Sequence, residues 1–194
     1  MKTNHSARGI RLTVLGTSLA LALGFGVFAA KPRAEDAPAS ADVKLESLNF
    51  EAFKARLAKA KANNYKYTIV DAWASNCGPC KENFPHLVAM HRKYAPKGLQ
   101  VISLSLDDTT DAKAVEAARR FLREKKATFL NVLLDEEFGV GFEKLEINAI
   151  PAVFLYGPDG KLLKRFTMDD PNNQFTYEQV EKAVDALLGG KPAA

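Results

Sequence analysis

The chain has two cysteines, Cys77 and Cys80, and only two residues separate them. Thiols at this spacing can close into a small disulfide that opens again by exchange with the sulfur of another molecule. Gly78 and Pro79 lie between them. Pro79 suits the first turn of a helix, because its missing N–H would have no partner there. We therefore expect Cys77 to lie at the N-terminus of a helix.

A helix N-terminus would favour the thiolate form of Cys77 over the thiol. Unpaired backbone N–H groups and the helix dipole stabilise negative charge at that end, so the pKa of the thiol falls. The thiolate is the attacking form in disulfide exchange, which makes Cys77 the expected nucleophile. Cys80, one helical turn further on, would then resolve the mixed disulfide.

Three other uses of a cysteine pair fit the sequence less well. An inert structural bridge would stabilise little, because it closes a loop of only four residues. A zinc site needs two further ligands at motif spacing, which His86 and His91 do not supply, and both histidines are expected to be solvated. Haem attachment requires a histidine where Lys81 stands. We expect no metal ion and no other cofactor.

Length and composition indicate one globular domain that binds no nucleic acid. Of the 194 residues, 47% are hydrophobic and 26% are charged, which are ordinary values for a folded protein. Three of the 27 basic residues, Lys2, Arg8 and Arg11, precede residue 31, leaving 24 against 23 acidic residues in the remainder. These charges are interspersed, whereas a nucleic-acid binder usually shows a clustered basic face.

Residues 1–30 have the pattern of a targeting segment. A basic start is followed by residues 12–30, which carry no charge. Val27-Phe28-Ala29 suits cleavage by a signal peptidase, and the 19 residues of the apolar stretch are also just long enough for an uncleaved membrane anchor. Both outcomes export the rest of the chain, so we expect a periplasmic or other extracytoplasmic location.

The remaining sequence divides into a linker and one folded domain. Residues 31–43 are rich in alanine and proline and predict a flexible linker. Residues 44–190 alternate helical and strand patterns and end with a hairpin and a helix, which indicates an α/β sheet covered on both faces. The expected elements are a helix after the N-cap Asn49 (50–60), a strand (65–74), a helix from the cysteines, a strand (99–106), a helix (115–126), a strand (129–134), a helix (137–146), a hairpin (150–156 and 161–166) and a helix (176–188).

The residues around the cysteines resemble those of thioredoxin. The resemblance rests on VDAWA at residues 70–74, on CGPCK at residues 77–81, on Pro85 and on the pair Ile150-Pro151. It extends in order over residues 44–190. It implies a thioredoxin-like fold, with a central mixed β-sheet flanked by helices on both faces.

Additions to the thioredoxin pattern narrow the resemblance. An extra helix and strand are inserted between Asp107 and Leu134, and a Gly-Pro-Asp-Gly turn at residues 157–160 joins the hairpin. Together with the exported context, these features are more similar to the thioredoxin-like reductases of the TlpA and ResA type.

The resemblance also assigns roles outside the cysteine pair. Asp71, six residues before Cys77, matches a buried acid that relays a proton to or from the second cysteine. Pro151 matches a cis-proline, whose preceding residue offers backbone groups to an extended substrate. Pro85 would kink the active-site helix, which is a structural role. The expected substrate-binding residues are Ile150, Pro151, Trp73, Asn76, Gly78 and Pro79.

Simpler explanations remain open for three positions when the residues are considered alone. Asp71 could be a strand-end acid paired with backbone groups, Pro151 a trans-proline at a strand start, and Trp73 an ordinary core aromatic. Two other positions depart from the family pattern. Asn76 stands where tryptophan is usual, so partner choice is expected to differ, and Asn83 stands where ResA-type reductases carry an acid.

These features together predict an extracytoplasmic enzyme of thiol redox homeostasis that reduces protein disulfides through Cys77 and Cys80. Its partners would be protein disulfides and an upstream thiol electron donor, either soluble or membrane-bound. One alternative is a disulfide oxidase or isomerase of the same fold, and another is a non-catalytic module that captures an extended segment near Pro151. A thiol peroxidase is disfavoured, because the chain lacks the Pro-x-x-x-Thr-x-x-Cys loop.

Overall fold

The computed structural model describes residues 43–137 and 139–189. The expected targeting segment, residues 1–30, and all but the last residue of the expected linker lie outside the described residues. Within the described ranges, no helix is both long enough and apolar enough to cross a membrane.

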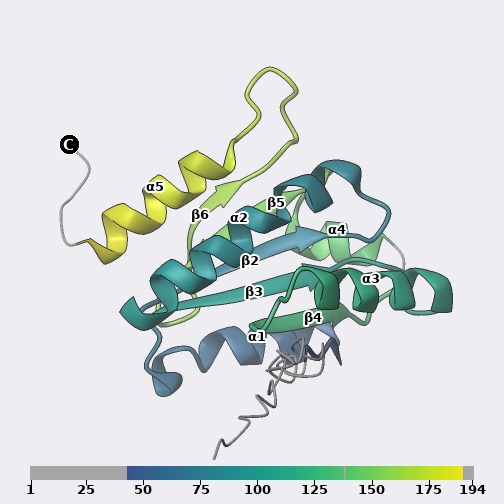
Figure 1. Ribbon diagram of the computed structural model, residues 1–194, viewed down its shortest axis with the longest axis horizontal. Helices are drawn as coiled ribbons and strands as arrows, with labels where there is room; N and C mark the ends of the chain where they lie inside the picture. The colour runs from purple at the N-terminus through teal and green to yellow at the C-terminus, as the bar shows by residue number, and fades with distance from the viewer. Residues whose placement is uncertain (1–42, 138, 190–194) are drawn as a thin grey trace, which may run out of the picture. The chain divides into compact units, whose positions relative to one another are not determined.

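A mixed six-stranded sheet forms the centre of the domain (Figure 1). The strand order is β1-β4-β3-β2-β5-β6, in which β1, β4, β3 and β2 run parallel while β5 and β6 join antiparallel. The mixed sheet of the expected thioredoxin-like fold is therefore confirmed. The strands are β1 (Glu46–Leu48), β2 (Tyr67–Trp73), β3 (Leu99–Ser105), β4 (Leu130–Leu134), β5 (Ala152–Tyr156) and β6 (Leu162–Phe166).

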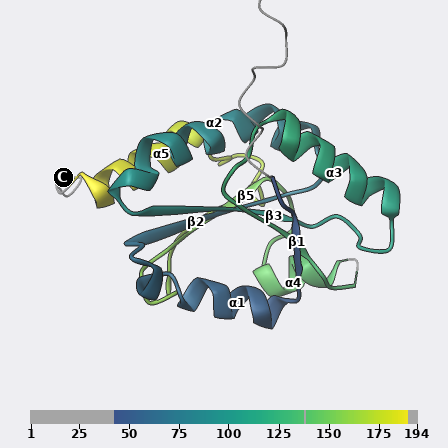
Figure 2. The same cartoon turned by 60° about the horizontal axis from the view of Figure 1, so that its bottom comes forward.

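Helices cover both faces of this sheet. Figure 2 shows α2, α3 and α5 on one face and α1 and α4 on the other. The inserted helix and strand of the sequence prediction are α3 and β4. The helices are α1 (Phe50–Ala58), α2 (Gly78–Tyr94), α3 (Ala112–Glu124), α4 (Val140–Leu145) and α5 (Tyr177–Leu188), with short 3₁₀ turns at Lys61–Asn63 and Ala95–Lys97.

The central strand β2 is buried on both faces, which explains its nearly continuous apolar sequence. Side chains alternate between the two faces of a strand. Ile69 and Trp73 pack in the core with α2 and α5, whereas Val70 and Ala72 pack in the core with α1. Asp71, between Val70 and Ala72, therefore faces the α2 and α5 side.

Most expected elements are present, with shifted ends. Asn49 caps α1 as predicted, because its side chain accepts a hydrogen bond from the Ala52 N–H at 2.9 Å. The helix α3 begins at Ala112, earlier than expected, because Asp111 caps it by accepting from two backbone N–H groups. The predicted helix 137–146 shortens to α4, which follows Gly139 at φ +88°.

The strand β1 is absent from the sequence prediction. It has three residues, Glu46–Leu48, which are too few to show an alternating pattern. Its partner gives it strand structure, since Glu46 to Leu48 pair in register with Val132 to Leu134 of β4. The strand structure at this edge of the sheet is therefore set by the tertiary contact with β4 and not by a local preference of its residues.

Candidate active site

The two cysteines form a disulfide at the start of α2, with their Cα atoms 5.3 Å apart. Cys77 is the N-cap of α2, and its sulfur accepts a hydrogen bond from the backbone N–H of Cys80 at 3.2 Å. Cys77 is half-buried, whereas Cys80 is only 1% exposed. A partner protein can therefore approach the sulfur of Cys77 but not that of Cys80.

The loop before Cys77 is held by a carboxylate that sequence reasoning missed. The backbone N–H of Ser75 donates to Asp107 Oδ1 at 2.9 Å, and the Ser75 hydroxyl donates to the same oxygen at 2.7 Å. Ser105 donates to Asp107 Oδ2 at 2.7 Å. The sequence did contain one signal for this contact, namely an acid after a buried strand. Parallel neighbouring strands end at the same edge of a sheet, so such an acid is expected near the loop that follows the next strand.

Trp73 does not occupy the substrate surface on which the sequence prediction placed it. Its side chain is 0% exposed, and its ring packs against Phe84 and Phe121 at centroid distances of 5.4 and 5.1 Å. A side chain with no exposed surface cannot contact a bound partner, so the core-aromatic alternative is correct. By contrast, Asn76, Gly78 and Pro79 are exposed beside Cys77.

The Ile150-Pro151 segment lies next to the disulfide. The peptide bond between the two residues is cis, as the thioredoxin resemblance implies. β5 begins one residue later, where Ala152 pairs with Ala72 of β2. The carbonyl oxygen of Ile150 lies 3.8 Å from the Cys77 sulfur. Pro151 itself is buried, so the backbone of Ile150 is the part of this segment that lies nearest the Cys77 sulfur.

Asp71 is a buried acid with one hydrogen-bonding partner. It is 1% exposed, and its Oδ2 accepts a hydrogen bond from the Tyr177 hydroxyl at 2.8 Å, while Oδ1 has no partner within residues 43–137 and 139–189. Burial raises the pKa of this carboxyl from 3.8 to about 7, and the Tyr177 bond acts in the opposite direction. Among the described residues, the Asp71 carboxylate pairs with the Tyr177 hydroxyl and not with a backbone group. The alternative of a strand-end acid paired with backbone groups is therefore wrong.

Tyr177 could not be connected to Asp71 from sequence. It lies 106 residues away, at the first position of α5 after the N-cap Thr176. Its ring is buried, stacks on His86 of α2 at 5.7 Å and contacts Phe175 at 5.5 Å. Only the packing of α5 against α2 brings the hydroxyl to β2.

Other residues of α2 have structural surroundings. The helix continues through Pro85, and the Asn83 side chain donates to the Pro79 carbonyl at 2.9 Å. His86 is exposed, as expected for a solvated histidine. His91 differs, because its Nδ1 is buried without a partner in the described part of the chain, its ring contacts Phe129, and burial lowers its pKa.

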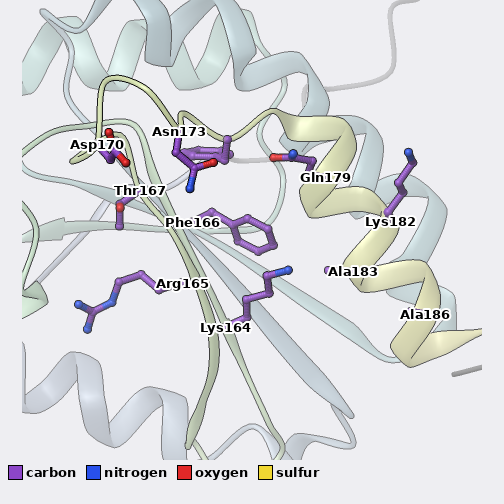
Figure 3. A pocket seen from close by; sticks show the side chains of 11 residues that line it. Lys164, Arg165, Phe166, Thr167, Asp170, Asn173, Gln179, Lys182, Ala183 and Ala186 are labelled. Atoms are coloured by element: carbon purple, nitrogen blue, oxygen red, sulfur yellow. The ribbon is translucent and has the colours of Figure 1, made fainter. Parts of the chain in front are cut away.

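The cysteines lie outside the groove between β6 and α5. Among the described residues, no group of three or more His, Cys, Asp or Glu side chains is arranged to hold a metal ion. A groove of about 580 Å³ lies instead between β6 and α5, where Phe166 faces Gln179 and Ala183 (Figure 3). The cysteines are not among its lining residues.

The fold and this site together define a thiol-disulfide oxidoreductase of the thioredoxin-like fold. A cysteine pair opens the helix after the central strand, and a cis X-Pro bond lies beside it. The chain belongs to the AhpC/TSA family, whose family model matches residues 36–165.

Individual relatives point to the same class. The chain is similar to the thiol-disulfide oxidoreductase ResA of Bacillus subtilis, with 23% identity over 156 residues and 80% of each chain covered. It is 26% identical to the thiol:disulfide interchange protein HelX of Rhodobacter capsulatus over 156 residues, covering 80% of this chain and 77% of HelX.

A solved structure agrees with these relatives. A crystal structure described as that of a thiol:disulfide interchange protein, DsbE, from Chlorobium tepidum has 30% identity and a TM-score of 0.52. The match covers 66% of this chain and 84% of the other. Together, these comparisons confirm the predicted resemblance to thiol-disulfide oxidoreductases of the ResA type.

Proposed function

We propose that this protein is an extracytoplasmic disulfide reductase that uses Cys77 as nucleophile and Cys80 as resolving thiol. The observation that carries the proposal is the asymmetry of the pair. Cys77 is accessible and accepts a hydrogen bond from a helix N-terminal N–H, whereas Cys80 is buried. The attacking thiolate must reach the substrate disulfide, so the accessible Cys77 is the sulfur that a partner meets first.

The reaction transfers two electrons from the protein dithiol to a substrate disulfide. The Cys77 thiolate attacks one substrate sulfur and breaks the substrate S–S bond, and the other substrate sulfur leaves as a thiolate that takes up a proton. Asp71 accepts the proton of the Cys80 thiol. The Cys80 thiolate then attacks the Cys77 sulfur and releases the second substrate sulfur as a thiolate. The protein ends the reaction with the Cys77–Cys80 disulfide that the structure contains.

The position of Cys77 on the helix contributes more to the equilibrium than to the attack rate. Lowering a thiol pKa from ~8.5 to ~7 raises its thiolate fraction at neutral pH from about 3% to about 50%. The weaker nucleophilicity of the more acidic thiol removes about fivefold of this gain, so the net benefit is about threefold. The stabilised thiolate chiefly tunes the reduction potential of the cysteine pair.

Asp71 is suited to the proton transfer by its surroundings. An acid whose pKa is about 7 can both accept and release a proton near neutral pH, which an ordinary aspartate cannot. It faces the same core as Cys80. We assign the proton relay to Asp71 on these two grounds.

The surface around Cys77 would bind the substrate. The Ile150 carbonyl beside the sulfur can pair with the backbone of an extended segment, and Asn76, Gly78 and Pro79 form the exposed rim. Asn76 presents a hydrogen-bonding amide where relatives of the TlpA and ResA type usually carry tryptophan. We infer that its partners offer a polar group at this point.

The uncharged stretch at residues 12–30 after a basic start supports export, and with it a protein disulfide substrate in the periplasm or an equivalent compartment. Reduction in an oxidising compartment requires an upstream thiol donor, soluble or membrane-bound, to regenerate the dithiol. Pro85 keeps its proposed structural role in α2.

The reducing direction is tested by the reduction potential of the Cys77–Cys80 couple, measured against glutathione. We expect a value well below about −180 mV, and a value well above it would indicate an oxidase or isomerase. Enzymatic activity is tested by insulin reduction with the wild type and Cys77→Ser. Equal turnover of the two would leave only the non-catalytic binding module near Pro151.

A further inference from the structure

The partner of Asp71 is fixed by the start of α5. Tyr177 is the first residue of that helix, and a capping box formed by Thr176 and Gln179 holds the turn. The ring is clamped between Phe175 and His86, so the hydroxyl has little freedom to leave Asp71 Oδ2 at 2.8 Å. This contact joins the C-terminal helix to the central strand of the sheet.

The two oxygens of Asp71 are consequently not equivalent. Oδ2 receives the Tyr177 O–H, whereas Oδ1 is buried and has no partner among the described residues. Burial and the nearby Asp71 charge raise the pKa of Tyr177, so its hydroxyl keeps its proton and remains a donor at physiological pH. While the Tyr177 hydroxyl donates to Oδ2, a proton added to Asp71 is taken up at Oδ1.

We propose that Tyr177 is a positioning residue for proton transfer, which holds Asp71 Oδ2 so that Oδ1 is the atom that takes the proton from Cys80. The inference rests on the proposed function, which gives Asp71 the role of proton acceptor. Tyr177 itself exchanges no proton with the cysteines. It sets which oxygen does so, and its hydrogen bond stabilises the carboxylate that forms before the transfer.

The groups around Asp71 leave Tyr177 as its principal polar contact. Its register neighbours are Ser103 on β3 and Val153 on β5, neither of which titrates. Cys80, which belongs to the same core cluster as Tyr177, lies on the α2 side of the sheet. Outside the ring of Tyr177 lie two surface groups, His86 and Glu178, which interact with each other.

The chain supplies a conservative variant and a matched control. Tyr177→Phe removes only the hydroxyl and keeps the ring that packs between His86 and Phe175. Tyr94→Phe removes a hydroxyl from another buried ring, where it binds Glu181 at 3.1 Å, far along α2 from the cysteines. The two variants lose the same atom, but only one of them changes the surroundings of Asp71.

The first measurement follows the Asp71 carboxyl by infrared spectroscopy in the oxidised full-length protein, with Asp71→Asn identifying its band. We expect a midpoint near pH 7 in the wild type. In Tyr177→Phe the midpoint should rise by roughly one to two pH units, the size expected from losing one hydrogen bond to the charged form. Tyr94→Phe should titrate like the wild type, and an unshifted midpoint in Tyr177→Phe would overturn the inference.

The second measurement follows resolution of a mixed disulfide preformed on Cys77. Because a higher pKa of Asp71 delays formation of the carboxylate, the rise of the resolution rate with pH should move to higher pH by the same amount in Tyr177→Phe. A moved infrared midpoint with an unmoved rate profile would also overturn the inference. The infrared titration needs no turnover, so absence of insulin reduction by the wild type would reveal failure of the proposed function separately.

Discussion

Ser75 binds Asp107 with both its backbone N–H and its hydroxyl, so the loop that leads to Cys77 is tied to the end of the neighbouring strand β3. Asp107 lies 32 residues further along the chain and is almost fully buried. Because β2 and β3 run parallel, both strands end beside the cysteines. The position of Cys77 is thus set by the sheet and by this carboxylate.

Asp107→Ala should lower both stability and activity. The substitution leaves the donors of Ser75 and Ser105 without an acceptor, which should reduce the free energy of unfolding by about 2–3 kcal/mol. The freed loop should lower kcat/KM for insulin reduction by about tenfold, at roughly 1.4 kcal/mol of lost positioning. Urea unfolding and insulin turnover measure the two effects. Asp108→Ala, which removes only a local turn contact with Thr110, is the control, and equal losses in both variants would contradict this role.

Asp71→Asn should remove a pH dependence of stability. The folded state keeps a proton on Asp71 up to about pH 7, whereas the unfolded chain releases it near 3.8. Stability from this group is therefore fully present below pH 4 and is lost as the pH rises to 7. About three pH units at ~1.4 kcal/mol each give a loss of about 4 kcal/mol, an upper estimate.

Urea unfolding of the oxidised protein at pH 4 and pH 8 measures this effect of Asp71. The wild type should lose several kcal/mol more than Asp71→Asn between the two pH values. Asp170→Asn, at an exposed acid, should behave like the wild type. Parallel pH profiles of the wild type and Asp71→Asn would show that burial leaves the carboxyl unperturbed.

Cys80→Ala should trap partner proteins. Without the proposed resolving thiol, a mixed disulfide on Cys77 should persist until another thiol attacks it. Non-reducing electrophoresis of the exported fraction should show adducts that disappear on reduction. Adducts of similar abundance with a Cys77→Ser variant that retains Cys80 would show that the buried sulfur is the one that reacts.

Asn131→Leu should destabilise the fold without altering the redox site. The Asn131 amide donates to the carbonyls of Lys44, Ala127 and Phe129 and accepts from Ser103, all at 2.8–3.1 Å. A leucine leaves these buried groups unpaired, so the free energy of unfolding should fall by about 3 kcal/mol. The exposed Asn148→Leu should change it by under about 0.5 kcal/mol. The reduction potential should be unchanged in both variants.

Local patterns were sufficient to predict most of the fold. Apolar runs located β2 and β3, Asn49 marked the start of α1, and the Gly-Pro-Asp-Gly turn identified the hairpin of β5 and β6. The strand β1 was missed because three residues carry no periodic signal and depend on β4 for pairing. Elements that exist only through a tertiary partner leave no local trace.

The site could be predicted where its residues are adjacent in sequence. The spacing of Cys77 and Cys80 alone predicts a redox-active disulfide. By contrast, Asp71 and Tyr177 are 106 positions apart, and Ser75 and Asp107 are 32 positions apart, so no local pattern predicts these contacts. Trp73 was misplaced for a related reason. An aromatic residue next to a motif has the same sequence pattern whether it faces a partner or the core, and only the packing of Phe84 and Phe121 decides between them.

The burial of Cys80 has a consequence for kinetics with two partners. In the proposed reaction, the protein that donates electrons and the protein that accepts them must both bond to the Cys77 sulfur, since the other sulfur is only 1% exposed. The two partners therefore exclude each other, and turnover follows a ping-pong scheme. A high concentration of either partner should then inhibit the reaction with the other. The rate of electron transfer should therefore fall when the concentrations of donor and acceptor differ widely.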